Sequence, residues 1–380
     1  MRESDKSVAF VVPCLNEQDT LGLVLTKIKE VCTTDFKDRR TEVIVCDNGS
    51  TDDSIKIAQA HGAKVVHCVQ RGYGAALLRG IEQASCEIVV FADADNTYDL
   101  LETPQLVDEL EKGYALVVGS RIQGEIHKRA MPFLHRYLGT PVLNFLLNLL
   151  YGEHNNKITD CNSGFRCFKR HDFLSWGIKS AGMEFASEML VKALKSGAKI
   201  SEVPISFYAD GSERAPHLKT WRDGMRHLLQ IFFDSPRFFF VTGCAVFVSN
   251  WLIIALGLFF GPVRVGFAEI LGLHSMMFGV LGSLFGITIW AVGMFLAVRI
   301  NANIRMYRYL IELPEDKLFW YSVMLTFVSV ALSLVIVIYW VVHGFRDIYI
   351  EKQTLAMVAF ASNGILLVWS VVTTHLLKRS

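Results

Sequence analysis

An apolar run and two acidic residues stand together in the stretch Ile88-Val89-Val90-Phe91-Ala92-Asp93-Ala94-Asp95. A short apolar run bounded by turn residues is typical of a buried strand in a parallel sheet. Ligands of such sheets bind beyond the carboxyl ends of the strands, where Asp93 and Asp95 would lie. Their hard oxygen atoms suit Mg²⁺ or Mn²⁺ carried by a diphosphate. The alternative is an ordinary turn at the strand end, because short Asp-x-Asp pairs recur by chance.

The same pattern of strand, polar turn and helix repeats over residues 8–119. The predicted strands are 8–12, 43–46, 64–68, 88–92 and 115–118. This alternation predicts an α/β domain with a mostly parallel sheet flanked by helices. A polar motif follows each strand: 13–17, 47–52, 70–74, 93–95 and 119–121. The motifs should therefore share one edge of the sheet.

Two of these motifs keep two interpretations each. Asp47 is placed to accept hydrogen bonds from a nucleobase or ribose, but its segment could instead only cap the next helix through Ser50 or Thr51. The segment 71–76, Arg-Gly-Tyr-Gly-Ala-Ala, is similar to a glycine-rich phosphate loop but lacks the full G-x-G-x-x-G pattern. Close packing of a helix on the sheet explains its glycines equally well.

The C-terminal part of the chain has a different composition. Of 380 residues 52% are hydrophobic, which is too many for one soluble domain. Four stretches without Asp, Glu, Lys or Arg, each able to cross about 30 Å of hydrocarbon, lie at 238–260, 275–298, 319–342 and 356–377. They predict an all-α transmembrane domain at 238–380 with four helices, because core helices of a soluble protein would rarely give four such runs.

Basic residues give the predicted orientation. The cationic segments are the one before the first span, the loop between the second and third spans, and the C-terminal Lys378-Arg379. Cytoplasmic loops of membrane proteins carry an excess of Lys and Arg, so both termini and the N-terminal domain are expected in the cytoplasm. The protein would be a multi-pass integral membrane protein. The eight cysteines lack Cys-x-x-Cys spacing and are interpreted as packing residues.

Taken together, six motifs carry a resemblance to a known family: 12–17, 46–52, 71–76, 93–95, 119–121 and 160–166. They resemble the family 2 glycosyltransferases with a GT-A fold. Within that family the chain is most similar to the polyprenyl-phosphate hexose synthases, the dolichyl-phosphate mannose synthase group. The likeness covers roughly residues 7–232, and the Ser-Gly-Phe-Arg block at 163–166 favours this subgroup.

The resemblance implies a role for several residues. The residues implied to line the nucleotide-sugar pocket are Pro13, Leu15, Glu17 and Asp47. Asp93 and Asp95 would bind a divalent metal, Mg²⁺ or Mn²⁺. Relatives often carry a glutamine two residues after the second aspartate, where this chain has Thr97, a weaker neutral ligand.

The acceptor side is also implied by the resemblance. Arg136 and Thr140 match positions that hold the phosphate of a lipid acceptor. They begin a Leu- and Phe-rich stretch, 137–151, which predicts an amphipathic helix at about 130–151 in the membrane interface. A helix simply packed on the sheet is the alternative.

Further cations are expected to offset the charge of two anionic substrates. Arg214 and Lys219, in a loop at 210–219, are predicted to clamp the donor diphosphate, although attraction to the membrane surface is an alternative for this basic region. Asp93 and Asp95, with Arg121 and Arg166, are the predicted catalytic residues. A polyprenyl monophosphate is largely dianionic, so a strong general base is optional. Asp160, Glu184 and Glu188 are acids that could serve a hydroxyl acceptor instead. A solvated helix face is the simpler account of Glu188.

The sequence therefore predicts a GT-A domain at 1–215, a basic juxtamembrane segment at 216–237 and the membrane domain. The predicted activity is inverting transfer of a hexose from a UDP- or GDP-linked sugar to an undecaprenyl or dolichyl phosphate at the cytoplasmic membrane face. A glycolipid synthase acting on a lipid hydroxyl, and a non-enzymatic transporter or sensor of lipid-linked sugars, are the alternatives. Membrane lipids are expected partners and self-association into a homo-oligomer is compatible with the sequence, whereas no nucleic acid partner is expected.

Overall fold

The computed structural model describes residues 7–152, 157–211, 220–265, 268–300, 314–342 and 351–379. Contacts within the chain divide it into two compact units, Met1–Ile231 and Phe232–Ser380. The first unit extends past residue 215, where the sequence places the domain boundary, and takes in most of the helix at Thr220–Phe233. Each unit is described by itself.

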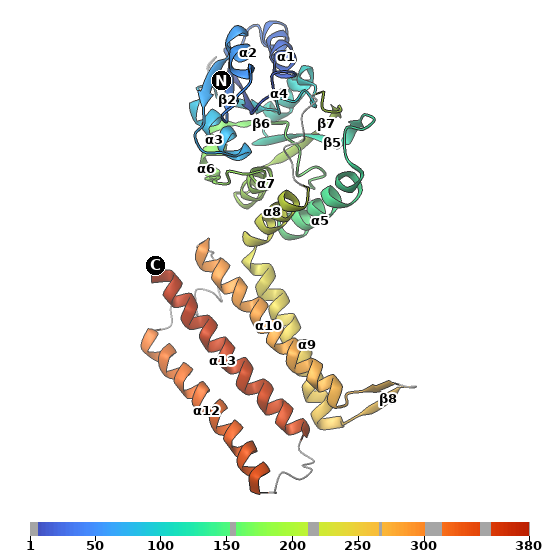
Figure 1. The fold of residues 1–380 in the computed structure, drawn as a ribbon, viewed down its shortest axis with the longest axis vertical. Coiled ribbons are helices and arrows are strands. Elements are labelled where there is room, and N and C mark those ends of the chain that lie inside the picture. The colour runs from blue at the N-terminus through green and yellow to red at the C-terminus, as the bar shows by residue number, and fades with distance from the viewer. Residues whose placement is uncertain are drawn as a thin grey trace. The chain divides into compact units, whose positions relative to one another are not determined.

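The first unit is built on a seven-stranded sheet with the order β3-β2-β1-β4-β6-β5-β7 (Figure 1). Its strands are β1 (Val8–Cys14), β2 (Thr41–Asp47), β3 (Lys64–His67), β4 (Ile88–Phe91), β5 (Leu116–Ile126), β6 (Arg166–Lys169) and β7 (Ile200–Phe207). The first four strands are parallel neighbours, whereas β6 runs antiparallel to both β4 and β5. The predicted α/β class with a mostly parallel sheet is confirmed, and all five predicted strands are present.

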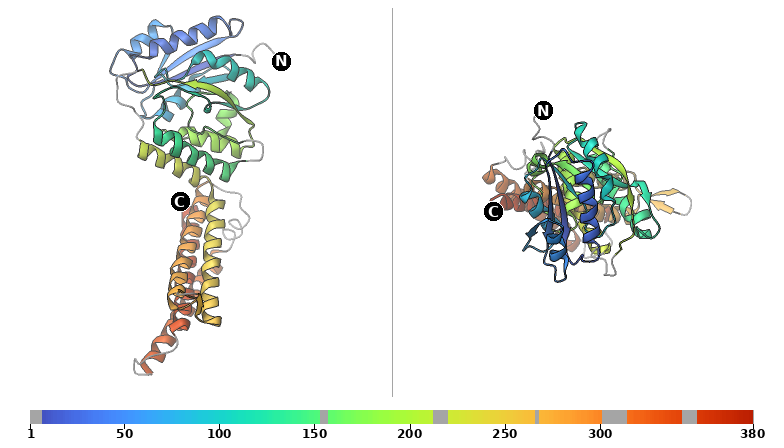
Figure 2. Two further views of the ribbon diagram at one scale, coloured as in Figure 1. Left: turned by 90° about the vertical axis from the view of Figure 1, so that its right-hand side faces the viewer. Right: turned by 90° about the horizontal axis from the view of Figure 1, so that it is seen from above.

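Helices cover both faces of this sheet, as Figures 1 and 2 show. The helices described in this unit are α1 (Leu21–Thr33), α2 (Ser54–Ala60), α3 (Tyr73–Gln83), α4 (Thr103–Glu111), α5 (Thr140–Tyr151), α6 (Arg170–Trp176), α7 (Phe185–Lys195) and α8 (Thr220–Phe233), with short turns η2 (Leu100–Glu102) and η3 (His135–Gly139). Two apolar cores result, one on each face. All seven residues of β1 are buried, which explains why its sequence is a continuous apolar run.

Helix α8 is anchored to α7 by a buried polar contact. The hydroxyl of Ser187 and Nδ1 of His227 lie 2.6 Å apart, and both residues are buried. Burial lowers the pKa of His227 to about 4, with the charge of Asp223 opposing this shift and that of Arg166 adding to it. A neutral imidazole is therefore part of the folded state.

This anchor predicts that acid destabilises the first unit. Below the usual histidine pKa of 6.5 the unfolded chain binds a proton that the folded His227 does not. The free energy of unfolding is therefore highest above pH 6.5 and decreases as the pH is lowered toward the pKa of folded His227. The loss is roughly 1.5 kcal/mol between pH 6.5 and about 5. Thermal unfolding of His227→Asn, which keeps a hydrogen-bonding group but cannot titrate, should depend less on pH than that of the wild type. Equal slopes for both proteins would contradict this assignment.

The described residues of the second unit form four long helices and one short hairpin. The helices are α9 (Pro236–Phe260), α10 (Leu273–Arg299), α12 (Glu315–Val342) and α13 (Glu351–Arg379), and the hairpin strands are β8 (Val263–Val265) and β9 (Ala268–Ile270). Among the described residues three helical segments are long and apolar enough to cross a membrane: Pro236–Phe260, Leu273–Arg299 and Lys352–Thr374. The remaining predicted span falls in α12, whose apolar segment Thr326–Val342 is shorter, so the fourth span stays a prediction.

Glycines bring α9 and α10 together (Figures 1 and 2). A Cβ atom on Gly243 would lie 2.6 Å from the Trp290 amide nitrogen, and one on Gly286 would lie 2.6 Å from that of Phe247. Small residues at such crossings let helix backbones pack closely where no hydrophobic effect drives association. A buried hydrogen bond of 2.8 Å from the Asn363 amide to the Ser283 hydroxyl joins α13 to α10.

Candidate active site

The two aspartates follow β4, as the sequence predicts, and each is held by a neighbouring side chain. The Tyr73 hydroxyl, at the start of α3, donates a hydrogen bond of 2.8 Å to Oδ1 of Asp93. The Thr97 amide and hydroxyl donate to Oδ1 of Asp95 over 3.0 and 2.7 Å. Thr97, which the sequence offers as a weak metal ligand, therefore orients Asp95. The structure builds a rigid support under both carboxylates.

These carboxylates fit a divalent cation. Burial, with the charge of Asp95, raises the pKa of Asp93 to about 7, so placing two negative charges here is costly without a compensating positive charge. The described part of the chain holds no cluster of three or more His, Cys, Asp or Glu side chains suited to a metal. Two protein oxygens with further ligands from a diphosphate or water match the usual binding of Mg²⁺, which keeps waters and substrate phosphates as ligands.

The segment 71–76 supports Asp93 rather than forming a phosphate loop. The Gly72 amide donates to Oδ1 of Asn48 and the Ala75 amide to the Ala181 carbonyl, so these amides are already engaged. A Cβ on Gly74 would lie 2.2 Å from the Ser180 carbonyl oxygen. The geometry favours the packing interpretation of these glycines. Their close approach brings the Tyr73 hydroxyl to Asp93.

Replacement of Tyr73 by phenylalanine is expected to raise the metal concentration for half-maximal activity by about tenfold, because groups that orient metal ligands commonly contribute this much. Mn²⁺ binding followed by electron paramagnetic resonance would show the same shift without substrate turnover. Tyr114→Phe, in the apolar core on the other face of the sheet, is the matched control and should leave metal binding unchanged. Unaltered Mn²⁺ affinity in Tyr73→Phe would exclude this role.

The residues predicted for the nucleotide lie at the ends of β1 and β2. Pro13 and Glu17 are buried and Leu15 is partly exposed. Asp47 accepts hydrogen bonds of 2.8 Å from the Ser50 amide and 3.1 Å from His67. Although burial acts to raise it, these hydrogen bonds lower the pKa of Asp47, which is therefore a charged acceptor.

The capping alternative for this segment is wrong. Helix α2 begins only at Ser54, and Asp52 accepts hydrogen bonds from the Ser54 amide and hydroxyl at 3.0 and 2.6 Å. Neither Ser50 nor Thr51 caps the helix. Asp47 instead orients the loop at the carboxyl end of β2 by accepting the hydrogen bond of the Ser50 amide. The family resemblance implies that the nucleotide binds at this loop.

Arg121, on β5, forms a buried ion pair that the sequence did not reveal. Its Nε and Nη2 atoms each donate to the Asp160 carboxylate over 2.7 Å, and its amide donates to the same group over 3.0 Å. The guanidinium also lies over the Phe207 ring, 5.0 Å from the centroid. Although burial opposes it, Asp160 raises the pKa of Arg121, which stays charged. Its charge is partly neutralised by Asp160 rather than wholly available to a substrate.

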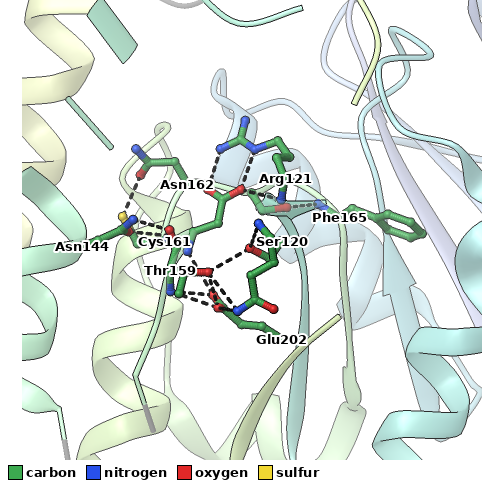
Figure 3. Close-up of polar contacts among 12 residues, drawn as sticks. Ser120, Arg121, Asn144, Thr159, Cys161, Asn162, Phe165 and Glu202 are labelled. Carbon is green, nitrogen blue, oxygen red and sulfur yellow. Dashed lines mark hydrogen bonds and ion pairs between the residues drawn. The ribbon is translucent and has the colours of Figure 1, made fainter. Parts of the chain in front are cut away.

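A second carboxylate, Glu202 on β7, supports this pair from below (Figure 3). It accepts hydrogen bonds from the Thr159 amide at 2.9 Å, the Asp160 amide at 3.0 Å and the Gln123 side chain at 2.8 Å. Sequence reasoning missed Glu202, because β7 carries no motif and alternates only weakly between buried and exposed residues. The loop before β6 is thus fixed to the sheet by two acidic residues.

Arg166 is not placed to contact a substrate, contrary to its predicted catalytic role. The side chain is wholly buried at the start of β6, with 0% exposure. Its guanidinium donates to the backbone carbonyls of Ser163, Ala186 and Cys161 over 2.9, 2.8 and 2.8 Å. Burial lowers the pKa of Arg166. The Ser-Gly-Phe-Arg block therefore holds the loop, and a Cβ on its Gly164 would lie 2.5 Å from Oδ2 of Asp93.

The predicted interfacial helix comprises η3 and α5. Arg136 is exposed, with its guanidinium 5.6 Å from the centre of the Tyr137 ring, whereas Thr140 is only 3% exposed. Large apolar side chains are exposed along one stripe of this segment: Leu138, Val142, Phe145 and Leu149. The opposite face is buried in the core through Leu143 and Leu147. The helix is both packed on the domain and apolar on its outer face.

The remaining predicted residues are distributed as follows. Arg214 and Lys219 lie outside the described residues. Glu188 is buried, accepts from the Ser180 amide at 2.7 Å and pairs with Lys192 at 2.6 Å, so the solvated-face interpretation is wrong. Oε2 of Glu184 is buried without a hydrogen-bond partner among the described residues.

In this mixed sheet an Asp-x-Asp pair follows β4, and the loop that carries Asp47 follows β2. This arrangement is that of a GT-A glycosyltransferase. Residues 9–173 match the family model described as glycosyl transferase family 2. A low-salt glycan biosynthesis hexosyltransferase of Haloferax volcanii is 33% identical over 296 residues, covering 77% of this chain and 68% of the relative. The chain belongs to glycosyl transferase family 2.

The chain is also similar in sequence to a second relative and in fold to a solved structure. A dolichyl-phosphate hexose transferase of Haloferax volcanii is 32% identical over 203 residues, covering 53% of this chain and 82% of that protein. The fold is similar to glucosyl-3-phosphoglycerate synthase of Mycobacterium tuberculosis, solved with Mn²⁺, uridine diphosphate and phosphoglyceric acid, with a TM-score of 0.50 and 24% identity over 61% of this chain and 80% of that one. This second likeness concerns the fold alone.

Proposed function

We propose that this glycosyltransferase moves a hexose, with inversion, from a UDP- or GDP-linked sugar to a polyprenyl phosphate. The observation that carries the proposal is the pair of carboxylates, Asp93 and Asp95, each held by its own donor at the end of β4. A relative named as a dolichyl-phosphate hexose transferase supports the acceptor class. A lipid hydroxyl is the competing acceptor. Oε2 of Glu184, which has no hydrogen-bond partner among the described residues, would then be the candidate base.

In this mechanism the chain mainly positions charge. Asp93 and Asp95 would hold a divalent metal, which offsets the charge that develops on the leaving nucleoside diphosphate. Asp47 orients the nucleotide loop, and Arg121 presents a fixed cation beside Asp160. Arg136 is exposed to meet the acceptor phosphate. Since that phosphate is largely dianionic, no side chain needs to remove a proton before attack on the face opposite the leaving group.

The proposed reaction takes place at the cytoplasmic face of a membrane. Basic residues flank the predicted spans on the side of both termini. The exposed apolar stripe of α5 supports an interfacial position for this helix, because an isolated soluble unit rarely exposes so continuous an apolar surface. With Thr326–Val342 as a further span, the chain would cross the membrane four times.

The experiment is transfer of radiolabelled sugar from UDP-glucose, GDP-mannose and other donors into membranes that contain undecaprenyl or dolichyl phosphate, with Mn²⁺ or a chelator. The proposal expects metal-dependent label in a lipid that mild acid hydrolyses. Label in an acid-stable lipid would favour a hydroxyl acceptor. Absence of label with every donor would favour the transporter or sensor alternative.

A further inference from the structure

Two asparagines on α5 bind the loop that precedes β6. Oδ1 of Asn144 accepts a hydrogen bond of 2.9 Å from the Cys161 amide, and its Nδ2 donates to the Thr159 carbonyl. One turn further on, Asn148 accepts 2.9 Å from the Ile158 amide and donates 2.7 Å to the Ile158 carbonyl. Figure 3 shows Asn144 directed at Cys161 and Thr159. The side-chain amides of both asparagines therefore hold the backbone of the loop against α5.

The position of Asn144 matters because its two partners bracket Asp160. Thr159 and Cys161 precede and follow Asp160, whose carboxylate receives three hydrogen bonds from Arg121. In this loop Asn148 contacts Ile158, two residues before Asp160, and its Nδ2 also donates 2.8 Å to the Asn144 carbonyl within α5. A shift of α5 at Asn144 would therefore move the partner of Arg121 directly.

The charge of Arg121 also acts on η3, the turn that carries Arg136, the residue predicted to bind the acceptor phosphate. Together with burial, its charge lowers the pKa of His135, the residue next to Arg136 on η3. On the other side of the loop, Gly164 lies against Asp93. The loop at 158–164 thus connects α5 both with Arg121 and with Asp93, one of the two carboxylates predicted to bind the metal.

The outer face of α5 is the part that would meet lipid. Val142, Phe145 and Leu149 are 44%, 65% and 60% exposed, while Asn144 and Asn148 are partly buried beside the loop. Contact with a membrane or a lipid acceptor on the outer face would fix the helix to which the loop is bonded.

We propose that Asn144 is a positioning residue, which transmits the placement of α5 to the Asp160–Arg121 pair and so sets the rate of transfer to the lipid acceptor. This inference deepens, and rests on, the proposed transfer to a lipid phosphate. Asn144 acts through Asp160, so it should govern the lipid-dependent step and not the binding of the nucleotide sugar.

The test compares Asn144→Ala with Asn148→Ala in the full chain reconstituted in lipid nanodiscs. Both variants remove an asparagine from the same helix and break hydrogen bonds to the same loop. For Asn144→Ala we expect kcat for lipid glycosylation to fall about tenfold or more, because misplacing an orienting group by a fraction of an ångström has such effects. The KM for the donor and the hydrolysis of the donor by water should change little. Asn148→Ala should stay within about threefold of the wild type in all three quantities.

Hydrogen–deuterium exchange without substrate provides a second readout. Asn144→Ala should speed exchange of the amides at 159–161 more than Asn148→Ala does. Equal losses of kcat in the two variants, or a rise in donor KM with Asn144→Ala, would overturn the inference in favour of simple anchoring.

Failure of the proposed function would look different. In that case the wild type itself would not glycosylate undecaprenyl phosphate, and the comparison would be made with the lipid that accepts label. A selective effect of Asn144→Ala on that lipid would keep the positioning role. If no lipid accepts label, unaltered exchange at 159–161 in Asn144→Ala would reject the positioning role and faster exchange would retain it.

Discussion

Replacement of Asp95 by asparagine is expected to lower metal-dependent sugar transfer by about 100-fold or more. Asparagine keeps an oxygen that can accept the hydrogen bonds of Thr97, so the loop should stay in place. It removes the negative charge, and hard divalent cations bind a neutral amide far more weakly than a carboxylate. The measurement is the initial rate of label transfer over a range of Mn²⁺ concentrations.

The matched control for this variant is Asp108→Asn. Asp108 is an exposed residue of α4, so the substitution removes the same charge away from the carboxyl ends of β1, β2 and β4. Its transfer rate should equal that of the wild type. If Asp95→Asn retained at least a third of the wild-type rate, or lost activity equally at every Mn²⁺ concentration, the metal role of this pair would have to be abandoned.

Replacement of Arg166 by methionine is expected to destabilise the first unit by about 3–5 kcal/mol. Three buried carbonyls would lose the guanidinium that donates to them, and no water can reach so deep a site to replace it. The loop that carries Gly164 beside Asp93 should loosen with it. Chemical unfolding followed by fluorescence would measure the loss of stability.

Arg170→Met provides the matched control. Arg170 also donates to two backbone carbonyls, those of Ile81 and Glu82, but it is partly exposed, so water can replace it. We expect a loss of no more than about 1 kcal/mol there. An Arg166→Met protein with wild-type stability and no transfer activity would instead restore the catalytic role that the sequence suggests.

The strands and the acidic pair were predictable because their signals are local. An apolar run such as 88–91 is long enough to identify a strand, and turn residues mark where it ends. Strand β6 was not predictable in this way. Its sequence, Arg-Cys-Phe-Lys, has a charged residue at each end, and only pairing with β4 and β5 makes it a strand.

The functional residues divide along the same line. Asp93 and Asp95 follow a recognisable strand, so their place could be read from the sequence. The partner of Arg121 could not be predicted from the sequence, because Asp160 is 39 residues away and a single sequence does not show which residues pair. An arginine in a motif looks identical whether it faces a substrate or, like Arg166, three carbonyls of its own chain.

The antiparallel strand β6 also limits when the sheet can be completed while the chain is being made. In the sheet, β4 and β5 do not touch, and β6 alone joins the half β3-β2-β1-β4 to the half β5-β7. A nascent chain that ends before residue 166 can therefore hold only separate fragments of the sheet. Among the described residues, the first helix long and apolar enough to cross a membrane begins at Pro236, so the ribosome makes β6 and β7 before that helix. All seven strands of the first unit are therefore present in the nascent chain, which can fold domain by domain, before the first of these helices is made.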